Sequence, residues 1–338
     1  MPEGDTVLRT ARRLDAALAG RALRSSDLRW PTLAAADLSG QVVREVVARG
    51  KHLLVRTDAG ETLHSHLRMD GSWHVQRTPP PTGAAPGRPP RLRGGSAEGV
   101  RAVLVTDDWT AVGHRLGMLD LVPTAEEDGL VGHLGPDLLA DDWDTGDGGT
   151  DGGGTDGGGT DGGGTDGGGT DGGGTGGAGA AVAALVADGD REVGAALLDQ
   201  RLVAGIGTFW MSETLFLRGV SPWAAVRDVP DVAGLLARTR RMMRAAADAR
   251  EPVQTTTGDT RPGRNRYVHA RSGLPCLRCG TTVRVAPLGS GPTARSAFLC
   301  PVCQPGPRPT DDGRPQAPLG HDRRGGAPAR RRGTSPRA

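Results

Sequence analysis

The stretch PEGDTVLRTARRLDAALAG, residues 2–20, decides how the chain begins to fold. Its apolar residues recur at helical spacing, its arginines fall on the opposite face, and Gly20 supplies a stop signal. The pattern predicts an amphipathic helix of about four turns. Such a helix would dock its apolar face on a core and hold Pro2 and Glu3 in one place. The apolar positions are Val7, Ala11, Leu14 and Leu18.

The first residues of this helix suggest a chemistry. Removal of Met1 would leave Pro2 as a free N-terminal secondary amine beside the carboxylate of Glu3. An α-amino group titrates at about 8 and a lysine at about 10.4, so roughly a tenth of the terminal amine is unprotonated at neutral pH. Condensation of this amine with a sugar aldehyde gives an iminium, which favours elimination of the neighbouring phosphates. Many chains begin with Met-Pro, however, and Pro is an ordinary first-turn residue of helices.

Residues 21–143 have the pattern of β structure. Short runs rich in strand-forming residues alternate with turn signals such as Asp70-Gly71, and they predict a sandwich of short strands. Residues 79–99 are rich in Pro, Gly and Arg and are expected to form a mobile loop between two strands. The expected strands are 41–47, 52–57, 62–67, 72–76, 101–106 and 110–112.

The composition changes abruptly after this region. Five consecutive copies of Asp-Gly-Gly-Gly-Thr occupy residues 151–175. The period is too short for a solenoid and the repeat has no apolar residue to bury, so a flexible linker is expected. Helical patterns resume at 182–186, 193–198, 209–217 and 231–249. A helix that starts just after Gly207 would offer an anion site at its N-terminus, although plain helix packing is the favoured interpretation.

All the cysteines of the chain form one pattern: C-x2-C, twenty intervening residues, then C-x2-C. Paired thiolates at this spacing wrap one Zn²⁺ tetrahedrally, with a β-hairpin between the pairs; two disulfides are the alternative. Four thiolates close the coordination, so the metal would be structural. The cysteines are Cys276, Cys279, Cys300 and Cys303.

The basic residues are almost all arginine. Lys51 is the only lysine among 41 basic residues, and the net charge is +2. Arginine is the better bidentate phosphate ligand, which suits nucleic acid, although a genome of skewed base composition produces the same bias. The chain has no run of about 18 apolar residues that could span a membrane. The first residues also lack the apolar segment of a signal peptide, so none is expected.

Together, these residues resemble the formamidopyrimidine-DNA glycosylase/endonuclease VIII family of base-excision repair enzymes, and the opening PEGDTV resembles its endonuclease VIII branch. The resemblance covers about residues 2–304, apart from the repeat tract and the loop at 79–99. The motifs are PEGDTV at 2–7, GKHLL at 50–54, HLRMDGSW at 66–73, LGPDLL at 134–139, LLDQRLVAGIG at 197–207 and the cysteine hairpin.

The resemblance implies an α+β multidomain fold with DNA in the cleft between its two halves. It has an N-terminal helix plus β-sandwich, a helix-two-turn-helix domain and a C-terminal zinc β-hairpin. We expect a catalytic domain at 1–143, a disordered repeat linker at 144–178, a helix-two-turn-helix domain at 179–270, a zinc finger at 271–304 and a basic disordered tail at 305–338.

The resemblance also implies roles for particular residues. Pro2 matches the Schiff-base nucleophile and Glu3 the acid that protonates the sugar, while Lys51 matches a lysine that contacts phosphate near the lesion. The remaining matches concern DNA and metal. Arg68 and Met69 match the region that fills the void left by a flipped base, Arg295 matches the phosphate-gripping arginine of the zinc hairpin, and Cys276, Cys279, Cys300 and Cys303 match the ligands of one structural Zn²⁺.

The sequence departs from the family pattern at two places. The family typically has a phosphate-binding Asn after AGIG, and this chain has Thr208, whose hydroxyl lacks the two-sided geometry of an amide. The family also joins its domains by a short connection. A long flexible tract between the two halves would lower the effective concentration of one half for the other.

We therefore expect a bifunctional DNA glycosylase/AP lyase. It would remove oxidised bases, with pyrimidines favoured, through a Pro2 Schiff base followed by β,δ-elimination. The expected partner is double-stranded DNA that contains oxidised bases or abasic sites. The protein is expected to be a cytoplasmic, nucleoid-associated monomer that does not bind membranes. The alternative is a noncatalytic lesion- or junction-binding protein that retains the fold, because Thr208 replaces the family's Asn.

Overall fold

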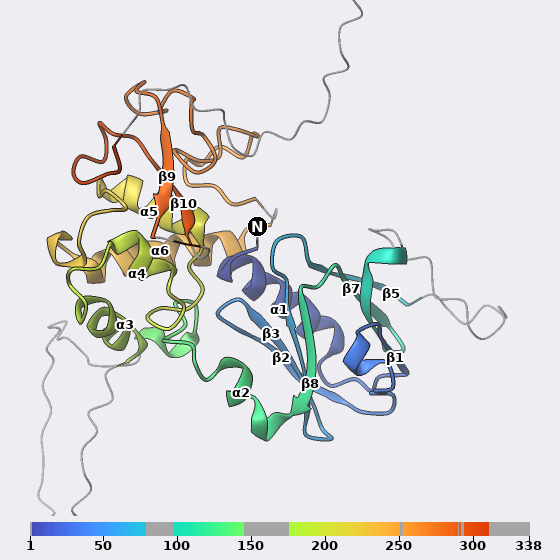
Figure 1. Ribbon diagram of the computed structural model, residues 1–338. Helices are drawn as coiled ribbons and strands as arrows, with labels where there is room; N and C mark the ends of the chain where they lie inside the picture. The colour runs from blue at the N-terminus through green and yellow to red at the C-terminus, as the bar shows by residue number, and fades with distance from the viewer. Residues whose placement is uncertain are drawn as a thin grey trace, which may run out of the picture.

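The computed structural model describes residues 2–78, 97–144, 176–250, 253–289, 291 and 294–310. Figure 1 shows a β-rich lobe that contains helix α1 (Gly4–Leu18) and a helical lobe that carries the C-terminal hairpin. The expected loop at 79–99 is described only from residue 97. Residues 145–175, which hold the whole repeat, and the tail from residue 311 lie outside the described residues.

The β-rich lobe is a sandwich of two four-stranded antiparallel sheets. One sheet has the order β1-β6-β7-β5 and the other the order β2-β3-β4-β8. The six expected strands are confirmed within a few residues, whereas β1 and β8 were not predicted. The strands are β1 Ser25–Leu28, β2 Val43–Arg49, β3 His52–Thr57, β4 Glu61–His66, β5 Ser72–Arg77, β6 Val100–Val105, β7 Trp109–His114 and β8 Met118–Pro123.

Helix α1 fills one side of the sandwich core. Its apolar face is buried as the 3.6-residue period predicts, and it packs against strands of both sheets. The opposite face reaches the helical lobe, where the Arg9 side chain donates to the main-chain oxygens of Ala246 and Ala247. The first helix therefore touches both lobes. Its buried neighbours include Leu53, Leu63, Trp73, Leu104 and Ala111.

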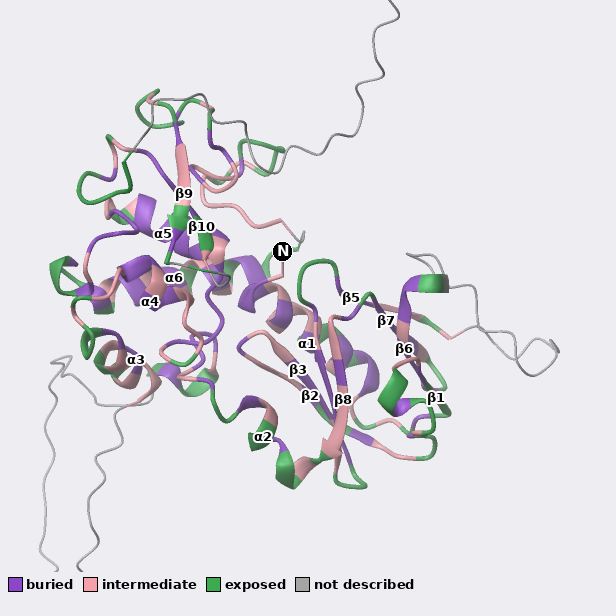
Figure 2. Ribbon diagram, viewed as in Figure 1, coloured by how far each residue is buried: buried purple, intermediate pink, exposed green. Residues whose placement is uncertain are grey.

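The helical lobe is built around α5 (Thr208–Arg218) and α6 (Val232–Asp248). Its core contains Trp210, Leu235 and Met243, and Trp143 of the preceding segment packs there too. Figure 2 shows this core as a buried band beneath exposed turns. The other helices are α2 Asp128–Val131, α3 Gly177–Val186 and α4 Val193–Leu198. Short 3-10 turns lie at Pro31–Leu33, Ala97–Gly99, Thr124–Glu126, Asp141–Asp144 and Val226–Asp228.

Strands β9 (Arg284–Leu288) and β10 (Arg295–Leu299) form an antiparallel hairpin that packs on α5. Phe216 of α5 shares a small core with Val268 and Phe298. The expected α+β class is confirmed, with an N-terminal helix and sandwich and a C-terminal cysteine hairpin. Across the described ranges, no helix has both the length and the apolar character needed to cross a membrane.

Candidate active site

Glu3 lies fully buried at the N-terminus of α5, more than 200 residues away along the chain. Its carboxylate accepts main-chain hydrogen bonds from Gly207 (3.0 Å), Phe209 (2.7 Å) and Trp210 (3.2 Å). These are the amides that a helix leaves without internal partners. The helix start after Gly207 is therefore an anion site rather than plain packing, and its anion is the protein's own carboxylate.

Three glycines permit this close approach. A Cβ on Gly207 would lie 2.3 Å from the carboxyl carbon of Glu3, and one on Gly4 would lie 3.0 Å from the Cα of Gly205. Gly205 itself has a φ of +103°, which side chains rarely allow. The main-chain N–H of Gly4 donates to the Gly205 oxygen at 3.0 Å. The sequence GIG and the helix start PEG thus form one packed unit.

Burial raises the pKa of Glu3 to about 7, against the opposing effects of the Lys51 charge and the α5 amides. Lys51 donates from Nζ to the main-chain oxygen of Ile206 at 2.6 Å. Burial lowers the pKa of Lys51, the carboxylate of Glu3 opposes that shift, and the charge of Arg295 adds to it. Glu3 is therefore an acid that can hold its proton near neutral pH beside a cation.

Two polar residues that the sequence analysis did not single out position Lys51. The buried Asp137 accepts from the main-chain N–H of Gly50 at 2.7 Å and from that of Leu139 at 2.9 Å. Gln200 accepts from Gly205 N–H and donates to the oxygen of Ile206, each at 3.0 Å. Asp137 lies in LGPDLL and Gln200 in LLDQRLVAGIG. The motifs therefore contain both residues, but they do not reveal which groups these residues contact.

Pro2 is half-buried at the mouth of an open pocket of about 360 Å³. Below it, Asp5 accepts from the indole N–H of Trp210 at 2.9 Å and from the amide of Gln254 at 3.0 Å. Neither Asp5 nor Gln254 was predicted to act in the site: Asp5 lies in the motif PEGDTV, which does not reveal its partners, and Gln254 lies in no motif. The other residues that line the pocket are Thr6, Phe209, Val253, Gln254, Asn265 and Arg266.

The expected DNA-binding residues fall into two groups. Thr208 begins α5 next to Glu3 and is half-exposed, and Arg295 begins β10 at the surface, close enough to Lys51 to affect its pKa. Met69 and Arg68 lie apart, on the turn after β4. The Met69 side chain is 64% exposed, and Arg68 has a φ of +49°. An exposed Met on a strained turn is consistent with a wedge.

A chain of histidines runs beside Lys51 on β3 and β4. The buried His64 bonds through Nδ1 to Asp120 at 2.9 Å and through Nε2 to Nδ1 of His52 at 2.8 Å. Burial lowers the pKa of His52 to about 3 and that of His66 to about 4, so both rings are neutral near pH 7. The hydrogen-bond chain stiffens the strand that follows Lys51.

The four cysteines converge at the base of the hairpin. Their sulfur atoms all lie within 4.8 Å of one another, and no disulfide joins them. The Cys279–Cys300 and Cys276–Cys303 sulfur separations are 3.4 and 4.0 Å. Tetrahedral zinc, with Zn–S bonds of about 2.3 Å, separates its sulfurs by about 3.8 Å. The four thiols can therefore bind one metal ion, and none of them is paired in a disulfide in this structure.

The sequence is similar to known proteins along most of its length. A model of the formamidopyrimidine-DNA glycosylase N-terminal domain matches residues 1–107. A Streptomyces coelicolor protein described as probable endonuclease 8 2 is 45% identical over 316 residues, which are 93% of this chain and 98% of that protein. A Mycolicibacterium smegmatis protein described as DNA-(apurinic or apyrimidinic site) lyase Nei2 is 37% identical over 304 residues, 90% and 99% of the two chains.

A solved structure shares the fold. It is the crystal structure of Lactococcus lactis formamidopyrimidine-DNA glycosylase, non-covalently bound to DNA that contains an abasic site. The TM-score is 0.62 at 18% identity, and the match covers 90% of this chain and all of that one. At this identity the likeness is one of fold.

Proposed function

The chain belongs to the formamidopyrimidine-DNA glycosylase/endonuclease VIII family, in its endonuclease VIII-like branch, and we propose that Pro2 and Glu3 are its catalytic pair. The protein is a DNA glycosylase with AP lyase activity in base-excision repair. The observation that carries the proposal is the placement of Glu3, a buried carboxyl with a pKa of about 7 directly beside Pro2.

In the proposed reaction, Pro2 becomes the N-terminal residue once Met1 is removed. Its amine attacks C1′ of the damaged nucleotide and displaces the base, while Glu3 gives its proton to the sugar ring oxygen and opens the ring. The resulting iminium acidifies the C2′–H bond. Loss of the C2′ proton expels the 3′ phosphate by β-elimination, and loss of the C4′ proton then expels the 5′ phosphate by δ-elimination. Lys51 stabilises the carboxylate that Glu3 becomes, and its ammonium contacts phosphate.

The remaining residues bind DNA in this proposal. Arg295 grips phosphate from the hairpin, and Thr208 offers a hydroxyl at the start of α5. Met69 enters the stack in place of the extruded base, and Arg68 supports it from the same turn. The substrate is double-stranded DNA that carries an oxidised base, with pyrimidines favoured, or an abasic site.

Zinc is the metal that the four thiols suit, because soft thiolates in a closed tetrahedral set select it. It would be bound by Cys276, Cys279, Cys300 and Cys303 and would hold the hairpin that presents Arg295. Four sulfur ligands leave no open position, so the ion contributes structure to the site and no step of the reaction.

The proposal extends to organisation. Residues 1–143 serve as the catalytic part, 179–270 as the helix-two-turn-helix part and 271–304 as the zinc-bearing part, with 144–178 as linker and 305–338 as a basic tail. The linker boundaries differ by a few residues from the structure, because Trp143 already packs in the helical core and α3 begins at Gly177. One chain supplies every residue of the site, which supports a monomer. A protein that acts on chromosomal DNA in this way belongs in the cytoplasm, on the nucleoid.

Borohydride trapping tests the nucleophile. Reduction during reaction with a lesion duplex is expected to link the DNA to residue 2, and Pro2→Gly is expected to lose the adduct. Because Lys51 is the only lysine in the chain, peptide mapping separates the two candidate amines. An adduct on Lys51 would overturn the assignment. Lesion binding without any adduct or strand cleavage would favour the noncatalytic alternative that Thr208 suggests.

A further inference from the structure

We propose that the pocket beside Pro2 reads the edge of the extruded base through Gln254 and Arg266, and that it selects lesions with an imide edge over lesions with an amidine edge. An imide edge is a carbonyl next to a ring N–H, as in oxidised uracil and thymine. An amidine edge is an amino group next to a bare ring nitrogen, as in oxidised cytosine. The inference rests on the proposed base excision and adds the substrate class.

The orientation of the Gln254 amide follows from its partner. Its Nε2 lies 3.0 Å from each of the two carboxylate oxygens of Asp5. Asp5 is buried and also accepts from the Trp210 indole, and in its ionised form it faces Gln254 as an acceptor only. Turning the amide over would set oxygen against oxygen. The amide nitrogen is thus bound to Asp5, which leaves Oε1 of Gln254 as an acceptor for a ligand.

Arg266 lines the same pocket and supplies a hydrogen-bond donor where Gln254 supplies an acceptor. Its Nε donates to the Asn265 side-chain oxygen at 3.2 Å, and the Asn265 amide donates to the main-chain oxygen of Gln254 at 2.8 Å. Among the described residues, Nη2 of Arg266 has no hydrogen-bond partner. A guanidinium is a donor only. Asn265 therefore ties together the two residues that present an acceptor and a donor.

The backbone that carries Arg266 is itself fixed. The buried carboxylate of Glu213, on α5, accepts main-chain hydrogen bonds from Tyr267, Val268 and His269, each at 2.8 Å. The same helix holds Glu3 by its first turn. Helix α5 therefore positions both Glu3, the neighbour of Pro2, and the backbone next to Arg266. The apolar residues Phe209 and Val253 also line the pocket.

This arrangement complements an imide edge. The lesion carbonyl accepts from Arg266, and its ring N–H donates to Oε1 of Gln254. An amidine edge reverses both groups, so its ring nitrogen would face Oε1 and its amino group would face the guanidinium. Polar groups that the bound base covers and leaves unpaired discriminate between such analogues.

The test uses 5-hydroxyuracil and 5-hydroxycytosine, which differ only at this edge. Single-turnover excision of each, opposite guanine, gives a preference ratio for the wild type and for Arg266→Leu. The cost of extruding each base is common to both proteins, so a change in the ratio reports the pocket alone. We expect the wild type to favour 5-hydroxyuracil, and Arg266→Leu to reduce that preference by about tenfold or more.

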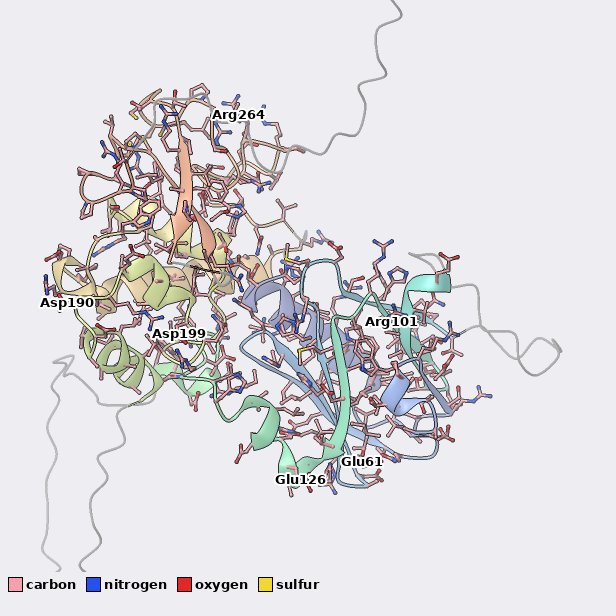
Figure 3. The ribbon with its side chains drawn as sticks, viewed as in Figure 1. Glu61, Arg101, Glu126, Asp190, Asp199 and Arg264 are labelled. Atoms are coloured by element: carbon pink, nitrogen blue, oxygen red, sulfur yellow. The ribbon has the colours of Figure 1, made fainter. Side chains whose placement is uncertain are left out.

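Arg264→Leu is the matched control. It removes the same charge two residues away, from an exposed side chain that contacts Asp259 and does not line the pocket (Figure 3). Its preference ratio should equal that of the wild type. Gln254→Leu should reduce the ratio as Arg266→Leu does. An unchanged ratio in Arg266→Leu, an equal loss in Arg264→Leu, or a wild-type preference for 5-hydroxycytosine would each overturn the edge-reading proposal.

Cleavage of a DNA duplex that contains an abasic site tests the proposed function separately from the edge-reading inference. An abasic site has no base to read, so wild-type cleavage there requires the Pro2 nucleophile and DNA binding but no contact from Gln254 or Arg266. If the wild type fails to cleave it, the proposed function has failed. If the wild type cleaves it but Arg266→Leu leaves the preference ratio unchanged, only the edge-reading inference has failed.

Discussion

At the scale of single residues, burial changes the acid–base behaviour of Glu3. Three helix amides and Lys51 stabilise its charged form, yet burial prevails and raises its pKa to about 7. A carboxyl of ordinary pKa would have lost its proton at neutral pH. The site thus combines an acid that retains its proton with amides ready to receive the anion it becomes.

This balance predicts a pH profile. The protonated fraction of Glu3 falls above about pH 7, whereas the unprotonated fraction of the Pro2 amine rises up to about pH 8. The single-turnover rate of base excision should therefore pass through a maximum between these values and fall above about pH 8. Glu3→Gln should excise bases slowly and lack this descending limb. Borohydride trapping on a preformed abasic aldehyde, where the ring is already open, supplies the control. If that reaction shows the same limb, the titrating group is not the ring-opening acid.

The sequence points to the proposed catalytic residues but not to the residues that hold them. Pro2, Glu3 and Lys51 stand in recognisable motifs. Three residues that hold the site have partners that only the tertiary structure brings close. They are Asp137, Gln200 and Gln254, and the partner of Gln254 is Asp5. Local periodicity and spacing contain no information about such contacts.

At the scale of elements, helix α5 organises the site, and Gly207 at its start has no room for a side chain. Gly207→Ala should push the Glu3 carboxyl away, slow base excision at least about tenfold and destabilise the fold by about 1–3 kcal/mol. Gly129→Ala in α2, where an added Cβ meets nothing within 4 Å, is the control. Chemical denaturation and single-turnover assays measure both effects, and equal behaviour of the two variants would contradict this account.

The hairpin gives a second prediction at this scale. Chelation of the metal or Cys300→Ser should unfold the hairpin and abolish DNA binding, because the Cys300 side chain is fully buried among the hairpin's few core residues. Arg295→Ala should weaken DNA binding while one zinc per chain remains, as measured by metal analysis. Active protein with much less than one zinc per chain would contradict the structural role.

Strands β1 and β8 were not predicted from the sequence. Both are edge strands, β1 beside β6 and β8 beside β4. The sequence of β1, SSDL, is largely exposed and polar, so it lacks the alternation of a half-buried strand. Its strand conformation comes from pairing with β6, from Ser25 opposite Val105 to Leu28 opposite Ala102, and this pairing is a tertiary contact.

At the scale of the whole molecule, the repeat tract joins two points that already lie side by side. Trp143 packs in the helical core, and a Cβ on Gly177 would lie only 3.3 Å from its Cα. The chain has therefore entered the helical lobe before the tract begins. We expected a long tract between the two halves to lower the effective concentration of one half for the other. That expectation does not follow from this arrangement.

Shortening the tract should therefore leave catalysis unchanged. Replacing residues 145–175 with about four flexible residues should preserve lesion binding and excision, and should raise the free energy of unfolding by up to about 2 kcal/mol through loop-closure entropy. Denaturation midpoints and binding titrations on the full chain measure this. A shortened protein that folds and holds zinc but fails to bind a lesion duplex would make the tract a functional element.

The contact between Glu3 and α5 also sets an order of events during synthesis. Residues 3 and 207 are 204 positions apart, so the ribosome delivers the partners of Glu3 roughly 10 to 40 s after the N-terminus, at about 5–20 residues per second. Until then the first residues have no helix to bind, and Met1 is accessible to an aminopeptidase. In the proposed mechanism the nucleophile would thus be made by processing before the pocket around it exists, and an N-terminal purification tag would leave a folded protein without its reactive amine.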